Sequence, residues 1–210
     1  MLRHSLLLLI SSGLFAGEQG ELMKAWDSPS LTLRAEAYFQ NNERDRTIYL
    51  FEPGKPQERV ILCKFNRDAE LLFSPDESWI ALNDVIGSIV SEIRLFKRIK
   101  GLNYSESNIH ADALSWKLLE RLHKIPRKVD LMHTYARVIK WSSDSSSFLV
   151  ALSGHTDINL HVDEWVCVFD LRTKRASLSL SLLNRKAVTF RLKRDGLGVS
   201  AKEKWHSPTT

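Results

Sequence analysis

One short pattern occurs twice in this chain, and it constrains the fold more than any other feature of the sequence. The first copy reads FSPDESWIAL over residues 73–82, and the second reads WSSDSSSFLVAL over residues 141–152. In each copy, an aromatic residue is followed by a short Ser- and Asp-rich segment and then by an apolar run. Ser, Asp and Pro are typical of tight turns, so each copy predicts two antiparallel strands joined by a turn.

The flanking sequence predicts more strands. Residues 47–53 and 59–65 are apolar runs separated by a Gly-Lys-Pro turn, which is typical of a hairpin. Residues 89–99 and 164–175 follow the two copies and are expected to add a strand to each. Residues 31–40 alternate apolar and polar side chains, so one face is expected to carry Leu31, Leu33, Ala35 and Ala37. The chain is therefore predicted to be mainly β.

One amphipathic helix is predicted between the two copies, over residues 111–126. Asp112 near its start and Pro126 at its end fit the usual helix boundaries. Its apolar stripe is expected to pack on a sheet and consists of Leu114, Leu118, Leu122 and Ile125. The two copies start 68 residues apart, and without residues 102–126 the spacing is 43. A propeller blade repeats every ~40–45 residues.

The residues of the two copies resemble the WD40-like and TolB-type β-propeller repeat. In the first copy the resemblance is carried by Phe73, Ser74, Pro75, Asp76, Ser78, Trp79, Ile80 and Ala81. In the second copy it is carried by Trp141, Ser142, Asp144, Ser146, Phe148, Leu149 and Val150. The resemblance implies that these segments are structural turns between the inner strands of a blade, formed by Ser74, Asp76, Ser142 and Asp144.

The resemblance covers only these two blocks, and the chain departs from the repeat inside them. Glu77 and Ser145 stand where the family usually has Gly nearby, and Ser143 replaces Pro. A closed propeller has typically four to eight blades of four strands. We therefore expect propeller-like repeated antiparallel hairpins, forming a partial or small propeller, a ring completed by a second copy, or a sandwich.

The N-terminal residues, MLRHSLLLLISSGLFAG, predict a signal peptide over residues 1–17. They combine a short basic start, an apolar run and small residues at the end, and the run is too short to span a bilayer. Export to the periplasm or the medium is therefore expected, with a single β-rich domain over residues 25–195 and no transmembrane segment after removal of the leader. The alternative is a retained, buried N-terminal run in an intracellular interaction domain.

The positive charge of the chain is concentrated near its C-terminus. The chain has a formal net charge of +5, and residues 185–204 hold seven basic and two acidic side chains. Residues 187–193, AVTFRLK, are expected to form a strand, and residues 196–210 a basic polar tail. A basic tail suits anionic surfaces, but the aromatic side chains typical of single-strand binding are not interleaved with it. No nucleic-acid partner is expected for an exported protein.

Two cysteines, Cys63 and Cys167, lie in strand-like runs. Each is expected to be a small buried residue. Export would permit a disulfide between them, and the sequence leaves their pairing open.

Residues 154–164, GHTDINLHVDE, are the most suggestive stretch for function. We expect a polar loop whose binding residues are His155, Asp157, His161 and Asp163. Imidazole and carboxylate groups can bind a divalent metal, but the spacing of His155 and His161 matches no standard signature, so they are weak metal candidates and no cofactor is predicted. His110 and Asp112 could form an acid–base pair, although their place at a predicted helix start favours capping.

The sequence contains no G-x-S-x-G, H-E-x-x-H, phosphate-binding glycine loop or C-x-x-C pattern. The expected function is an exported, non-catalytic binding or scaffold module whose partner is a protein or an envelope polymer. The alternative is an envelope hydrolase with a His/Asp metal or acid–base site in residues 154–164. The oligomeric state stays open.

Overall fold

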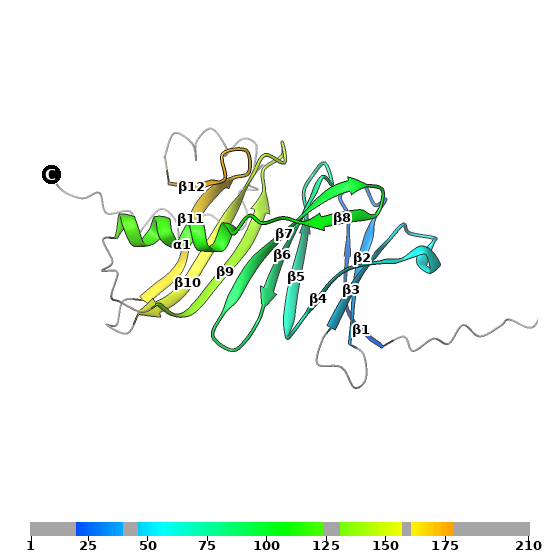
Figure 1. Cartoon of the computed structure of the whole chain (residues 1–210), viewed down its shortest axis with the longest axis horizontal. Coiled ribbons are helices and arrows are strands. Elements are labelled where there is room, and N and C mark those ends of the chain that lie inside the picture. The colour runs from blue at the N-terminus through cyan, green and yellow to red at the C-terminus, as the bar shows by residue number, and fades with distance from the viewer. Residues whose placement is uncertain (1–19, 40–45, 124–130, 157–160, 179–210) are drawn as a thin grey trace, which may run out of the picture.

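In the described part of the chain, the fold consists of three antiparallel sheets of four strands and one α-helix (Figure 1). The structure is a computed structural model that describes residues 20–39, 46–123, 131–156 and 161–178. The predicted signal peptide, the strand over 187–193 and the tail over 196–210 lie outside the described residues. The prediction of a mainly β chain of repeated antiparallel hairpins with one inserted helix is confirmed.

Each sheet is a meander in which every strand pairs with the next one along the chain. The first sheet consists of β1 (Glu21–Asp27), β2 (Arg34–Phe39), β3 (Arg46–Phe51) and β4 (Val60–Phe65), with a short 3-10 helix at Pro56–Glu58 before β4. The second consists of β5 (Asp68–Phe73), β6 (Trp79–Val85), β7 (Ser91–Lys100) and β8 (Asn103–Glu106). The third consists of β9 (Leu131–Trp141), β10 (Ser147–Thr156), β11 (His161–Asp170) and β12 (Arg175–Ser177). Four-stranded units of this kind build propeller blades, of which a closed ring needs four or more.

The three sheets lie in a row and pack through their faces (Figure 1). We call the side of a sheet turned toward the next sheet in the chain its forward face, and the opposite side its backward face. For the third sheet, the forward face is the side turned away from the second sheet. Ala35 and Ala37 on the forward face of the first sheet share a core with Ile80 and Leu82 of the second. The other core joins the second sheet, the third sheet and the helix, and includes Ala81. Successive side chains along a strand point to opposite faces of the sheet, so the second sheet contributes to both cores.

The turn between β1 and β2 is a third copy of the repeated turn, which the sequence analysis did not predict. In each turn a serine hydroxyl accepts a hydrogen bond from the backbone N–H five residues later, at 2.9–3.0 Å. The three pairs are Ser28 with Leu33, Ser74 with Trp79, and Ser142 with Ser147. The residue three positions after each serine has a positive φ of 56–60°, and these residues are Leu31, Glu77 and Ser145.

This third turn corrects one expected strand face. Leu31 was predicted to share a face with Leu33, but it occupies the positive-φ position of the turn and its side chain is 68% exposed. Leu33, Ala35 and Ala37 are buried as expected. The alternation therefore holds only from Leu33 onward, immediately before β2 begins to pair at Arg34.

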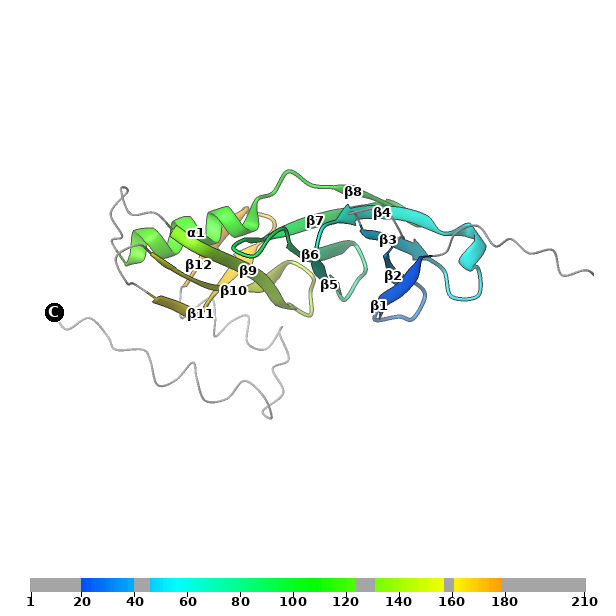
Figure 2. The same cartoon turned by 90° about the horizontal axis from the view of Figure 1, so that it is seen from below.

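The helix α1 (Ala111–Leu122) lies between β8 and β9 and packs against the third sheet (Figure 2). Its predicted apolar stripe was wrong in part, because Leu114 and Leu122 are exposed. Leu118 is buried, and the rest of the buried face consists of Ala111, Ser115, Trp116 and Leu119. Leucines occur on both sides of this helix, so the period alone did not select the side that meets the sheet. Ile125 and Pro126 lie outside the described residues.

The start of α1 also differs from the prediction. His110, not Asp112, holds the N-cap position, and its side chain makes no capping hydrogen bond. Asp112 lies in the first turn, where a carboxylate suits the positive end of the helix dipole. Within the described ranges, no helix is both long and apolar enough to cross a membrane.

Both cysteines are buried and free, in different cores. Cys63 belongs to the core between the first two sheets, and Cys167 to the core that includes α1. Burial raises the pKa of the Cys63 thiol to about 12 and that of the Cys167 thiol to about 11. Thiols with raised pKa values are poor nucleophiles at neutral pH.

Candidate functional site

The segment predicted as a polar loop is largely strand. His155 lies near the end of β10 and His161 is the first residue of β11, and the two are directly paired in the antiparallel register. Asp163 is exposed in β11, whereas Asp157 lies outside the described residues. The prediction of a loop was therefore wrong for residues 154–156 and 161–164, and residues 157–160 lie outside the described residues. The exposed end of a hairpin and a loop are both rich in polar residues, so composition could not distinguish strand from loop here.

The fold adds a third histidine that the sequence analysis missed. His133 of β9 stacks on His155, with ring centroids 4.8 Å apart and planes 23° apart. His155 is 5.9 Å from His161, with planes 37° apart. We call His133, His155, His161 and Asp163 the histidine group. His133 is distant in sequence, and only the pairing of β9 with β10 brings it here.

Irregular pairing positions the histidine group. The register between β9 and β10 shifts between Ser153 and His155, and His133 has a positive φ of 52°. Gly154 lies at this shift, where a Cβ would be 2.8 Å from the backbone oxygen of His133 and 3.2 Å from Cη2 of Trp116. Only glycine fits this close approach of two strands and the helix. Gly154 therefore fixes how near β10 comes to His133.

An ion pair holds the adjoining part of β11. The Nη2 atom of Arg137 is 2.6 Å from the carboxylate of Glu164, and the backbone N–H of Glu164 donates to the Ser153 hydroxyl at 3.2 Å. Both charged side chains are about half exposed, so the pair contributes at most ~1 kcal/mol to stability. Its effect is to orient β11 beside the histidine group.

The chemistry open to the histidine group is that of partly accessible imidazoles. Neutral imidazole offers one hydrogen-bond donor and one acceptor, together with a flat ring for stacking. Over the part of the chain that the structure describes, no group of three or more His, Cys, Asp or Glu residues is arranged to hold a metal ion. The hydrogen-bonding and stacking capacity of these rings can recognise a polar or aromatic group.

A second polar group lies between the first and second sheets. Arg94 of β7 donates to both carboxylate oxygens of Glu106 at 2.8 and 2.9 Å, and to Asp84 at 3.0 Å. It also donates to the backbone oxygen of Lys64 in β4 at 2.9 Å. Burial raises the pKa of Asp84, whereas hydrogen bonds from Arg94 lower the pKa of Glu106. This guanidinium joins two sheets, so its role is structural.

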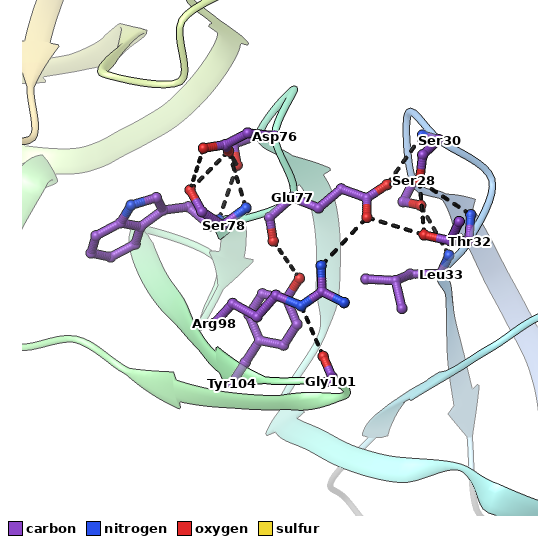
Figure 3. A network of polar contacts seen from close by, with 12 residues as sticks. Ser28, Ser30, Thr32, Leu33, Asp76, Glu77, Ser78, Arg98, Gly101 and Tyr104 are labelled. Atoms are coloured by element: carbon purple, nitrogen blue, oxygen red, sulfur yellow. Dashed lines mark hydrogen bonds and ion pairs between the residues drawn. The ribbon is translucent and has the colours of Figure 1, made fainter.

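A third polar group centres on Glu77 and links the first two turns (Figure 3). The Glu77 carboxylate accepts hydrogen bonds from the Ser30 backbone N–H at 3.1 Å, from the Ser30 hydroxyl, and from the Thr32 hydroxyl at 3.2 Å. Arg98 lies 3.5 Å from the same carboxylate, and the Tyr104 hydroxyl donates to the Glu77 backbone oxygen at 2.6 Å. Burial alone would raise the pKa of Glu77, but these hydroxyl and amide donors outweigh it and lower the pKa.

The same link recurs between the second and third turns. The Asp76 backbone N–H donates to the Ser145 hydroxyl at 3.1 Å, just as the Ser30 N–H donates to Glu77. Ser30 and Asp76 are equivalent positions, and so are Glu77 and Ser145. The positive-φ residues of the second and third turns, Glu77 and Ser145, therefore each accept a hydrogen bond from the preceding turn. We call this row of linked turns the turn ladder.

The aspartates of the turn ladder bond within their own turns. Asp76 accepts from the Ser74 hydroxyl at 2.7 Å and from the Ser78 backbone N–H at 3.0 Å. Asp144 accepts from the Ser142 hydroxyl at 2.6 Å and from the Ser146 backbone N–H at 3.2 Å. These bonds satisfy donors that the tight turns leave without a strand partner.

Comparison with known proteins identifies no family for this chain. No protein-family description and no curated protein matches the sequence. Among solved structures, the fold is similar to TolB from Acinetobacter baumannii, with a TM-score of 0.43 and 14% sequence identity. The match covers 75% of this chain and 32% of that chain, so this protein spans about a third of the length of TolB. A likeness at this level assigns no function.

Proposed function

We propose that this protein is an exported, non-catalytic binding module whose partner is a protein that contacts the histidine group. The observation that carries the proposal is the stacking of His133 on His155 beside His161, at an accessible end of the third sheet. Three rings from three adjacent strands form an accessible surface that the strand pairing holds in place. Flat, ordered rings lose little conformational entropy on binding.

The other two polar groups support this assignment by contrast. Arg94 of the second sheet bonds to Lys64 of the first sheet and to Asp84 of its own sheet, and Glu77 bonds to the preceding turn. These bonds link the first sheet to the second, which supports a structural role for both groups. Asp163 and His161 of the histidine group are exposed, so a partner can reach them.

Export is the second part of the proposal, and the N-terminal sequence supports it. Residues 1–17 have the basic start, short apolar run and small end residues of a secretory leader. Expression of the full chain in a secreting host, followed by denaturing mass spectrometry, tests this directly. We expect the mature chain to lack ~16–17 N-terminal residues. A full-length chain retained inside the cell would refute export without bearing on the histidine group.

Binding is tested with variants of the full chain against envelope proteins of the source cells, followed by titration with the purified partner. We expect His155→Ala and His161→Ala each to weaken binding by about tenfold or more, as loss of a contact at the centre of an interface does. His110→Ala is the matched control, because His110 is an exposed histidine at the start of α1. Equal binding by all three variants would refute the assignment.

The wild-type chain and the His155→Ala variant also distinguish binding from catalysis. The adjacency of His155 and His161 is the one observation that favours the hydrolase alternative. Native mass spectrometry on protein purified without chelators should show no stoichiometric metal if the group only binds a partner. One metal ion per chain, lost in His155→Ala, would replace the binding module with a metal-dependent hydrolase. Retention of an envelope polymer instead of a protein would change the partner class.

A further inference from the structure

The forward face of the third sheet is aliphatic, with Leu149, Ala151 and Val168 buried and the other side chains half-buried. Its side chains come from β9, β10 and β11 and are Ile139, Leu149, Ala151, Val166 and Val168. Leu149 is 8% exposed, Ala151 2% and Val168 0%. On the backward face of the same sheet lie the second sheet and α1, through the core that contains Phe148, Val150 and Leu152. None of the described strands or helices belongs to the cluster on the forward face other than those of the sheet itself.

The equivalent positions of the first two sheets show what packs on their forward faces. Ala35, Ala81 and Leu149 are equivalent, because each lies seven residues after the first serine of its turn. Ala35 and Ala81 both pack in the core toward the next sheet. Leu149 therefore occupies a position that, in the first two sheets, receives a following β-layer.

A second pair of equivalent positions supports the same reading. Asn83 and Ala151 each lie nine residues after the turn serine. Asn83 meets the next sheet directly, since its side chain donates to the Val138 oxygen at 3.0 Å and accepts from the Val138 N–H at 2.7 Å. The forward face is thus the side on which each sheet contacts its successor.

The opposite end of the row has different chemistry. On the backward face of the first sheet, Arg34 is paired with Glu36 at 2.8 Å, and the Tyr38 hydroxyl donates to Glu36 at 2.6 Å. The positions equivalent to Arg34 in the other sheets are Ile80 and Phe148, which are buried. The row therefore starts with a polar face and ends with an aliphatic one. A second copy stacked head to tail would place charged groups on aliphatic side chains, which is unfavourable.

We propose that residues 179–210 of the same chain dock on the forward face of the third sheet and supply a further β-layer. β12 ends at Ser177, on the edge of this sheet beside β11. Residues 179–186 separate this edge from the apolar and polar alternation of residues 187–193. Eight extended residues can span up to ~28 Å. That exceeds the width of four strands at a spacing of ~4.8 Å.

The side chains that would meet the aliphatic face are Val188, Phe190 and Leu192. They alternate with Thr189, Arg191 and Lys193, so a strand through this segment has one apolar side and one polar side. Phe190 is the largest of the three and is the anchor of the interface. Arg191 is its neighbour on the other side, which makes it a matched control.

The test uses thiol accessibility in the full chain. Leu149→Cys places a reporter on the forward face, whereas Ile99→Cys places one at a position of β7 that is 63% exposed. The native Cys63 and Cys167 are buried and report global unfolding. We expect Leu149→Cys to react slowly with a water-soluble thiol reagent. Adding Phe190→Ala should speed the reaction by about tenfold or more, as loss of a packed aromatic side chain opens an interface. Adding Arg191→Ala should leave it unchanged.

Three results would overturn the proposal. Leu149→Cys could react as fast as Ile99→Cys, or its rate could be insensitive to Phe190→Ala. Its protection could also rise with protein concentration, which would assign the face to a second copy. Hydrogen exchange on the chain with its native Leu149 gives an independent readout. Phe190→Ala should raise exchange in β10 and β11 and leave exchange in the first sheet unchanged. An increase of the same size in all three sheets would also contradict the proposal.

Discussion

Replacement of Glu77 tests the turn ladder most sharply, because one side chain carries the link between the first two turns. Its carboxylate is buried, with the residue 6% exposed, and it accepts hydrogen bonds from the Ser30 N–H, the Ser30 hydroxyl and the Thr32 hydroxyl. A hydrogen bond to a charged group contributes ~1.5–3 kcal/mol to the free energy of unfolding. The contribution is at the low end when the donor can bond to water after its acceptor is removed. Ser30 and Thr32 are exposed, so Glu77→Ala is expected to lower the free energy of unfolding by about 2–3 kcal/mol.

The backbone at Glu77 gives a second variant that separates the side chain from the turn. The residue has a φ of 58°, in the left-handed region that glycine adopts without strain. Glu77→Gly loses the same hydrogen bonds as Glu77→Ala but relieves ~1 kcal/mol of backbone strain. The expected order of stability is wild type, then Glu77→Gly, then Glu77→Ala. Urea unfolding at neutral pH measures all three, with the exposed Glu58→Ala as control.

The pH dependence of the same group has a definite sign. The folded state lowers the pKa of Glu77 below its usual value of 4.5. A lowered carboxyl pKa adds stability that is fully present above the unfolded-state pKa and is lost as pH falls through the folded-state pKa. The difference in unfolding free energy between wild type and Glu77→Gln should therefore be largest near neutral pH and shrink below pH 4.5. An unchanged difference across this range, or no loss of stability in Glu77→Ala, would refute the proposed link.

Three further predictions concern other parts of the chain. Gly154→Ala should cost about 1–3 kcal/mol of unfolding free energy, because its Cβ would press on the His133 backbone oxygen, and urea unfolding checks this. Arg94→Met should cost about 3 kcal/mol at neutral pH, since it leaves the buried Asp84 carboxylate unpaired, and the loss should diminish in acid as Asp84 is protonated. Cys63 should react with thiol reagents only on unfolding, because burial raises its pKa to about 12; rapid reaction of the folded chain would contradict this.

The repeated turns could be predicted where their residues are typical of the pattern. Asp76 and Asp144 follow a serine by two residues and bond back to it, and both copies were recognised from the sequence. The third copy, the turn between β1 and β2, was missed because Ser30 stands where the other copies have Asp, and Leu31 fills a position that usually excludes large side chains. Glu77 of the next turn supplies the carboxylate that this copy lacks. A local pattern could not reveal a group contributed by another repeat.

The candidate site was predictable only in part, for a related reason. His155 and His161 stood out as neighbours in sequence, and the hairpin pairs them. His133 joins them through the strand pairing of β9 with β10, a contact that no local pattern encodes. The helix shows the same limit, because leucines on both of its sides left the buried face to be decided by the sheet it meets. Residue types within a short segment were enough to predict two of the turns, whereas the position of His133 and the buried face of α1 depend on tertiary packing.

Histidine footprinting with and without the bound partner tests the proposed binding surface most directly. Diethyl pyrocarbonate modifies accessible imidazoles, and mass spectrometry locates the modified residues. We expect partner binding to protect His133, His155 and His161 and to leave His110 as reactive as in the free chain. Protection of His110 with no change at the other three histidines would show that the partner binds elsewhere.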